Sequence, residues 1–167
     1  PRSTPSSTLF PSTTLFRSQA AIRQLVFDPT DNRVAPGATE TTTFTVAVND
    51  QLAITSNNTT TVVSTSVNDA PVIGAAVAGQ AVNDNATVSL FTGLTITDAD
   101  TGENDITASV TLDTAAKGVF TAASLTASGF VNAGGGVYTH AATTAAAMQT
   151  AIRQLVFDPT DNRVAPG

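Results

Sequence analysis

Carboxylate and amide side chains gather in one short stretch of the chain, "DADTGEND". It places Asp98, Asp100, Glu103 and Asp105 directly after a predicted strand. Calcium takes six to eight oxygen ligands from carboxylates, amides and backbone carbonyls. Asp-Ala-Asp at the end of a strand lets both carboxylates converge once the chain turns. The stretch therefore predicts a Ca²⁺ site centred on Asp98 and Asp100.

Two further clusters extend this predicted ligand set. Asn68 and Asp69 lie in "SVNDAP", and Asp84 lies in "AVNDNAT". If strand ends share one pole of a β-fold, these groups would lie near "DADTGEND". The alternative is that Asp and Asn occupy turns, where they hydrogen-bond their own backbone. An EF-hand is excluded, because no D-x-D-x-D-G loop with a glutamate at its twelfth position occurs.

The repeated segment "DPTDN" (residues 28–32 and 158–162) is a second acidic stretch. Proline in its second position is typical of a β-turn, so we interpret the segment as a turn before any metal role.

Catalytic chemistry finds little support in the residue types. His140 is the only histidine, and there is no cysteine to accompany it. "NAGGGV" is glycine-rich but lies between two predicted strands, whereas a phosphate-binding loop precedes a helix. Asp98 and Asp100 resemble a glycosidase pair only in type, since one strand end carries both and no tryptophan is present to stack on sugars. We predict that the chain is not an enzyme and has no catalytic residues.

The composition limits the class of protein and its partners. Thirteen acidic residues against seven basic ones give a net charge of −6. Such a chain repels nucleic acid and anionic membranes but attracts cations. The lack of cysteine leaves bacterial surface proteins and cytosolic proteins open. No apolar run reaches the roughly 18 residues that span a bilayer, so we expect no membrane insertion of this segment.

An internal repeat organises the chain. Residues 21–37, "AIRQLVFDPTDNRVAPG", return unchanged as residues 151–167. The 130-residue period predicts a window cut from a tandem array, with residues 19–69 ending one repeat and residues 70–167 beginning the next. Residues 1–18 resemble a translated sequencing adapter, with a disordered Pro/Ser/Thr linker as the alternative, and we expect no stable structure there.

Within the repeat, most segments have strand patterns. Alternating or β-branched runs predict strands at residues 87–91, 94–97, 106–112, 155–157, 41–50 and 60–69, and a glycine-rich hairpin spans residues 130–138. One helix is predicted from Thr143 or Thr144 to Leu155, with Met148 and Ile152 on its buried face. The pattern favours an all-β fold, an antiparallel β-sandwich with one short helix.

In this order the landmarks form a familiar series. "VNDAPVI" (residues 67–73) opens the unit, "TITDADTGEND" follows a strand, and "FTVAVND" closes it before a further strand. The chain resembles the cadherin-like and immunoglobulin-like tandem repeats of large bacterial surface adhesins. It departs from them where "VNDQ" precedes that further strand, which leaves the subfamily open. Independently, Pro71 restricts Ala70 to extended backbone and predicts a short, stiff junction.

The resemblance implies a function. It implies a structural spacer repeat of an extracellular bacterial cell-surface adhesin, stiffened by Ca²⁺ at the junctions between repeats. Its partners would be neighbouring repeats and host or matrix surface ligands, and neither nucleic acid nor a membrane. The alternative is an adhesion module that itself binds carbohydrate or protein. Because each repeat is split, we also predict that residues 38–69 either fold back onto residues 70–167 or exchange between molecules.

Overall fold

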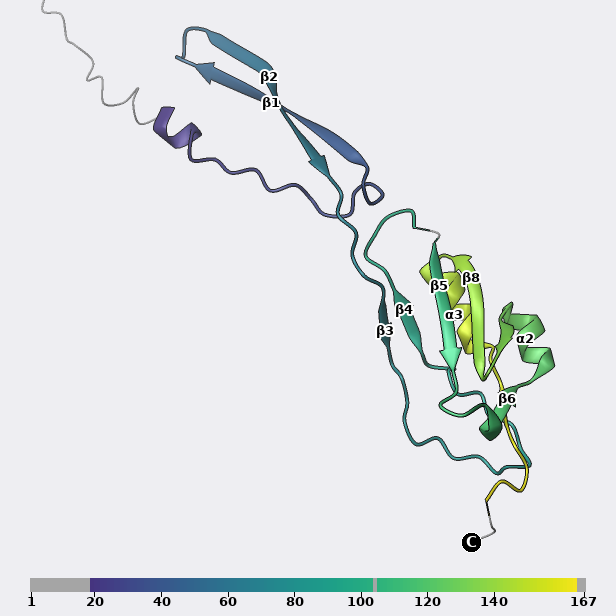
Figure 1. Ribbon diagram of the computed structural model, residues 1–167. Helices are drawn as coiled ribbons and strands as arrows, with labels where there is room; N and C mark the ends of the chain where they lie inside the picture. The colour runs from purple at the N-terminus through teal and green to yellow at the C-terminus, as the bar shows by residue number, and fades with distance from the viewer. Residues whose placement is uncertain (1–18, 104, 165–167) are drawn as a thin grey trace, which may run out of the picture. The chain divides into compact units, whose positions relative to one another are not determined.

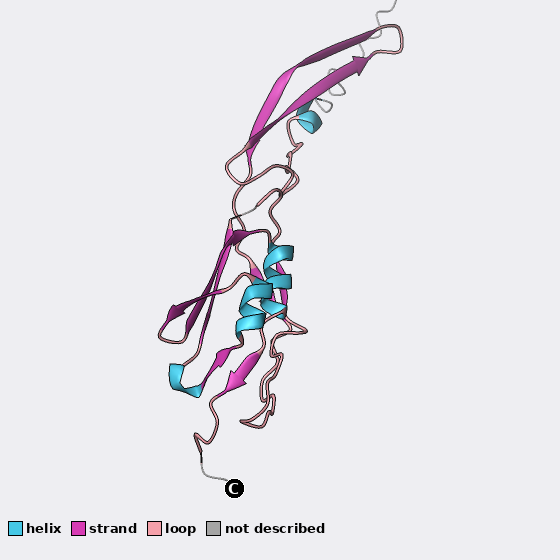
Figure 2. Ribbon diagram, turned by 90° about the vertical axis from the view of Figure 1, so that its right-hand side faces the viewer, coloured by secondary structure: helices cyan, strands magenta, loops and turns pink. Residues whose placement is uncertain are grey.

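A computed structural model describes residues 19–103 and 105–164 of the chain (Figure 1). Backbone contacts divide the chain between Thr30 and Asp31, so residues 19–30 are described by themselves. The rest contains antiparallel strands and a few short helices (Figure 2). The all-β class is therefore borne out in its coarse form, whereas closure into a sandwich stays a prediction. The predicted leader, residues 1–18, lies outside the described residues.

Residues 19–30 form one helical turn followed by extended chain. The turn covers residues 19–22, and the amide of Arg23 donates to the Gln19 carbonyl at 3.2 Å. Leu25 and Val26 are 80% and 93% exposed. The hydrophobic side chains of this segment are thus largely open to solvent.

A long hairpin follows, made of β1 (Thr39–Asn49) and β2 (Ile54–Thr65). The two strands pair antiparallel from Thr39 opposite Thr65 to Asn49 opposite Ile54, with a bulge between Phe44 and Val46. Within the sheets of the structure, each of these strands pairs only with the other.

Asp50 shapes the turn of this hairpin. Its carboxylate accepts the amides of Leu52 and Ala53 at 2.9 and 2.7 Å, and Gln51 takes a left-handed φ of 74°. The amides of Ala53 and Leu52 stabilise the ionised carboxylate and lower the pKa of Asp50.

Residues 70–164, which we call the body, hold three small antiparallel sheets. Their strands pair as β3–β4, β5–β8–β7 and β6–β9. The bounds are β3 Val72–Gly74, β4 Thr95–Thr97, β5 Ile106–Thr111, β6 Gly118–Phe120, β7 Val131–Gly134, β8 Val137–Thr143 and β9 Phe157–Pro159. A 3-10 turn, η1 (Ala115–Lys117), and two helices, α2 (Ala122–Ser128) and α3 (Ala145–Arg153), complete the body.

The core lies between α3 and these sheets. Tyr138, Met148 and Leu155 are its largest fully buried side chains. Phe120 packs edge-on against Tyr138 with ring centroids 4.9 Å apart, and the Tyr138 hydroxyl lies 3.4 Å from the Phe120 amide. Thr144 caps α3 by accepting the amide of Ala147 at 3.2 Å. The body thus has a hydrophobic core.

Several predicted elements are confirmed. The strand at residues 106–112 appears as β5, whose residues alternate between half-buried and exposed from Ile106 onward. The glycine-rich hairpin appears as β7 and β8, with Gly134, Gly135 and Gly136 all at positive φ. The predicted helix appears as α3, with Met148 and Ile152 buried.

Three expectations were wrong. Residues 87–91 form a turn and a single bridge from Val88 to Phe157 instead of a strand. The strand expected at residues 155–157 begins at Phe157, because Leu155 still closes the turn that ends α3. A second helix, α2, was missed, although Thr121 caps its start and Gly129 ends it in a left-handed conformation.

Candidate metal centre

The β4–β5 loop brings three predicted ligands together. β4 ends at Thr97, and the Asp98 carboxylate then accepts the Asp100 amide at 3.0 Å. This local turn folds both carboxylates back toward Glu103. One oxygen from each of Asp98, Asp100 and Glu103 lies within 4.8 Å of the other two. No other group of this kind occurs among residues 19–103 and 105–164.

Two oxygen atoms in this triad lack partners. Asp98 Oδ2 and Asp100 Oδ1 are buried from solvent and make no hydrogen bond to any residue that the structure describes. Burial of a charged oxygen is costly unless a hydrogen-bond donor or a cation compensates it. A cation bound between the two carboxylates would compensate both oxygen atoms at once. The three carboxylates of the triad offer the hard oxygen ligands that Ca²⁺ prefers.

The pKa of Glu103 is raised at its position among the other carboxylates. Desolvation raises its pKa, and the neighbouring charges of Asp98, Asp105 and Asp100 raise it further. Like charges gathered in this way disfavour the ionised form of each other. A bound divalent cation would reverse that effect.

Asn68, Asp69 and Asp105 lie around the same site. The Asp69 amide donates to Asp100 Oδ2 at 2.7 Å, and the Asn68 side chain donates to the Asp69 carbonyl at 2.6 Å. Asn68, Asp69, Glu103 and Asp105 line one open hollow of about 270 Å³. Thus six of the seven predicted ligands lie at, or directly beside, the triad.

Asp84 is the exception. Its carboxylate accepts the amide of Asn162 at 2.9 Å. The long β3–β4 loop that contains it runs to the end of the body that holds Asn162, whereas the β4–β5 loop lies at the other end (Figure 1). Within this body the structure does not bring Asp84 to the triad.

The two "DPTDN" segments share a left-handed asparagine. Asn32 and Asn162 both have left-handed φ angles, 58° and 53°. The Asn32 side chain donates to Asp69 Oδ2 at 3.1 Å, and its carbonyl accepts the Thr101 hydroxyl. The first of these turns therefore contacts both Asp69 and the β4–β5 loop.

The sequence prediction missed Asn32 and Thr101 as junction residues. The exact return of "DPTDN" was the signal that could have indicated a further role for the turn, but its proline-based interpretation as a simple β-turn needed no partner.

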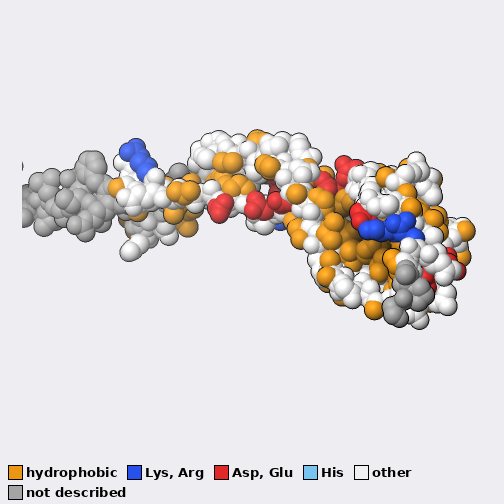
Figure 3. Space-filling view, turned by 60° about the horizontal axis from the view of Figure 1, so that its bottom comes forward, with side chains coloured by type: hydrophobic (Ala, Val, Ile, Leu, Met, Phe, Trp, Pro, Cys, Tyr) orange, Lys and Arg blue, Asp and Glu red, His pale blue; other side chains and the backbone are white. Residues whose placement is uncertain are grey.

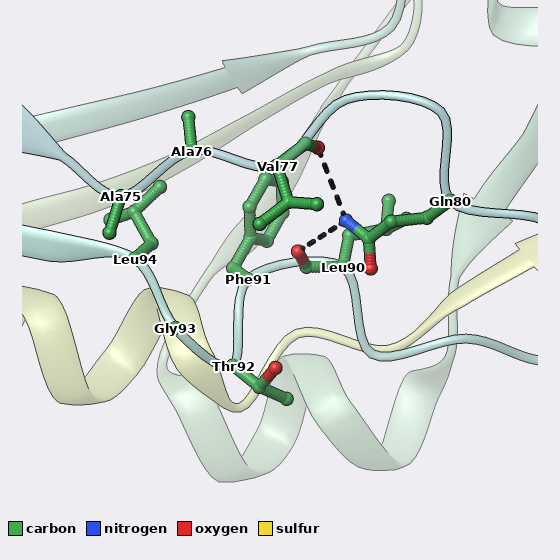
Figure 4. Close-up of a pocket in the computed structure, with 9 residues that line it drawn as sticks. All are labelled: Ala75, Ala76, Val77, Gln80, Leu90, Phe91, Thr92, Gly93 and Leu94. Carbon is green, nitrogen blue, oxygen red and sulfur yellow. Dashed lines mark hydrogen bonds between the residues drawn. The ribbon is translucent and has the colours of Figure 1, made fainter.

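Two other features of the body have structural roles. The His140 ring lies 5.1 Å from the Phe130 ring, and its Nδ1 is 2.7 Å from the Ala141 carbonyl. The pocket in Figure 4 is held by Gln80, whose side-chain amide donates to the carbonyls of Val77 and Leu90. These bonds anchor the β3–β4 loop and bring no reactive group into the pocket.

Comparison with family models, with curated proteins and with solved structures gives no significant match for this chain. The likeness to adhesin repeats therefore stays a prediction from the sequence. Among the described residues, no helix has the length and hydrophobicity needed to cross a bilayer.

Proposed function

We propose that the chain is part of a tandem array of sandwich-like repeats that spaces a bacterial surface adhesin outward, with Ca²⁺ at each joint. The observation that carries this proposal is the pair of buried, unpartnered oxygens on Asp98 and Asp100. They lie beside the junction at which the Asp69 amide meets Asp100. A cation there would act on the joint and not only on one repeat.

The repeated turn supplies a way to build that joint. Asn162 uses its backbone amide to bond Asp84 of its own repeat. Asn32, its counterpart, uses its side chain to contact Asp69 at the end of its own repeat and its carbonyl to contact Thr101 of the following repeat. Because these bonds use different atoms, one turn can make both sets together. In an array, Asp84 of one repeat would then approach the triad of the next.

Asp98, Asp100 and Glu103 would hold the cation, with Asn68, Asp69 and Asp105 at the rim of the site. Calcium neutralises carboxylates that otherwise repel one another, and it favours the conformation in which they converge. Since the Asp69 backbone is bonded to Asp100, ordering of the loop also orders the start of the body. A stiffer joint keeps successive repeats extended, which is the property that a spacer needs.

Nothing in the described residues favours the alternative of a carbohydrate-binding module. Aromatic side chains are the usual platform for sugars, but the chain has no tryptophan and a single tyrosine. That residue, Tyr138, is only 1% exposed.

Calcium titration of the full chain tests the proposal. We expect heat of binding in calorimetry and a higher melting temperature in Ca²⁺ than in chelator. Asp98→Asn and Asp100→Asn should each remove most of both effects. Asp113→Asn, at an exposed carboxylate paired with Lys117, is the matched control and should keep them. No Ca²⁺ uptake at millimolar concentration, with a melting temperature unmoved by chelator, would refute the site.

Stiffening of the joint needs its own measurement. The chain has no native cysteine, so spin labels can be placed at Thr43→Cys in the hairpin and Thr139→Cys in the body. Both positions are exposed. The distance distribution between the labels should narrow when Ca²⁺ is added. A distribution of unchanged width in a chain that does bind Ca²⁺ would refute the mechanical role while leaving the metal site intact.

A further inference from the structure

An apolar groove opens between β4 and β5 of the body. Its volume is about 490 Å³, and its walls include Ile73 of β3, Ile96 of β4, Val110 of β5 and Met148 and Ile152 of α3. Ile73 is 68% exposed. Figure 3 shows that hydrophobic side chains remain open at the surface of the body. The groove reaches the core, because Met148 is completely buried at its floor.

The groove lies beside one open sheet edge. β5 pairs with β8 on one side only, whereas the Ile96 amide of β4 already donates to the Gln149 side chain of α3 at 3.0 Å. A strand edge without a partner presents free backbone amides and carbonyls, and it readily accepts a strand from elsewhere. An occupant of this groove can therefore both cover apolar side chains and pair with β5.

The β1–β2 hairpin has a matching apolar face. In the register of the two strands, Val46, Val48 and Val62 lie on one side. Val48 is 60% exposed and Val46 is 40% exposed. A two-stranded hairpin is only marginally stable by itself in water, so this face needs a second layer to pack against.

The sequence repeat indicates which surface packs against the apolar face of the hairpin. Residues 21–37 lead directly into the hairpin, and the same seventeen residues, 151–167, include the last strand of the body, β9. Along an array, a hairpin of this sequence therefore comes directly after a body of this sequence. In the present chain the hairpin precedes its body, and β1 and β2 pair only with each other.

We propose that the β1–β2 hairpin of one chain occupies the β4–β5 groove of a second copy of the same chain. Each chain then donates one hairpin and accepts another. The contact is heterologous, since the donated and accepting surfaces differ, and such contacts propagate head to tail unless they close into a ring. The inference depends on the sequence repeat and not on the calcium site, so the two can fail separately.

Charge-introducing variants of the full chain test this assembly. Val48→Asp blocks the donated face, and Ile73→Asp blocks the groove. Val131→Asp is the control, because Val131 is 65% exposed in β7 and lies outside the groove. In sedimentation velocity we expect concentration-dependent oligomers for the wild type and the control. Each blocking variant alone should associate at least about tenfold more weakly, because a buried unpaired charge is costly.

Mixing the two blocking variants gives the sharpest result. The Val48→Asp chain keeps an intact groove, and the Ile73→Asp chain keeps an intact hairpin. Together they should form a capped one-to-one dimer at concentrations at which each variant alone stays largely monomeric. A wild type that stays monomeric at all concentrations, or variants that associate as strongly as the wild type, would overturn the proposal.

A covalent readout covers the case in which Ile73→Asp does not fold. Val48→Cys and Ile73→Cys in the cysteine-free chain should form a disulfide between molecules, seen as a ladder on a non-reducing gel. A disulfide within single chains would show that the hairpin folds back onto its own body, and it would overturn the exchange. Absence of any cross-link would overturn it as well.

Discussion

Leu25 and Leu155 occupy the same position in two identical segments of the chain. Leu155 is fully buried, whereas Leu25 is 80% exposed. Replacing each with alanine therefore makes the same chemical change among the same sequence neighbours. Any difference between the two variants reports tertiary packing alone.

The burial of each leucine determines how much stability its replacement by alanine should cost. Truncation of a fully buried leucine to alanine costs about 2–5 kcal/mol, from lost transfer energy and the cavity left behind. In a domain of about 100 residues each kcal/mol lowers the melting temperature by roughly 4–8 °C. Leu155→Ala should therefore melt at least about 8 °C below the wild type. Leu25→Ala should stay within about 0.5 kcal/mol of it.

Circular dichroism melts and urea unfolding of both variants, at one protein concentration and in chelator, make the comparison. Concentration must be held constant because association through the groove would itself shift the melting temperature. Equal destabilisation by the two substitutions would mean that residues 19–30 pack as tightly as α3. A negligible effect of Leu155→Ala would refute the assigned core.

Three further predictions concern single contacts. Gly118→Ala would place its Cβ 2.4 Å from the Asp158 carbonyl and should cost about 1–3 kcal/mol in urea unfolding, whereas Gly93→Ala meets no atom within 4 Å and should cost little. Because the folded protein raises the pKa of Glu103 above its ordinary 4.5, the contribution of Glu103 to stability in chelator should be greatest below that pH and fall as pH rises through the raised pKa. Glu103→Gln should remove this dependence in unfolding curves taken between about pH 4 and 7. Thr144→Ala should cost about 1 kcal/mol by removing the cap of α3, and Thr144→Ser should restore it.

Local sequence patterns determined several elements of the body. The alternation from Ile106 onward placed β5, and consecutive glycines placed the β7–β8 hairpin. The spacing of Met148, Ile152 and Leu155 placed α3 and its buried face. α2 escaped prediction because its Ala-, Ser- and Thr-rich sequence has a weak apolar period, so its helical state depends on caps and packing.

The candidate metal site was also partly predictable from local sequence. Asp98, Asp100 and Glu103 lie within one loop, and residues close in sequence must lie close in space. Asp84 was grouped with them on the assumption of a shared pole. The β3–β4 loop carries it instead to Asn162, a partner 78 positions later. Only the path of the chain in three dimensions decided that contact.

The repeated segment separates the two kinds of information within one molecule. Its sequence by itself determined the left-handed backbone at the asparagine of "DPTDN", because Asn32 and Asn162 adopt the same conformation in both copies. Tertiary structure decided everything else about it. Arg33 pairs with Glu40 while Arg163 bonds the Ala116 carbonyl, and Leu25 is exposed while Leu155 is buried. Backbone preference is a local property of the residues, but burial requires other elements to pack against them, and only the second copy has those elements around it.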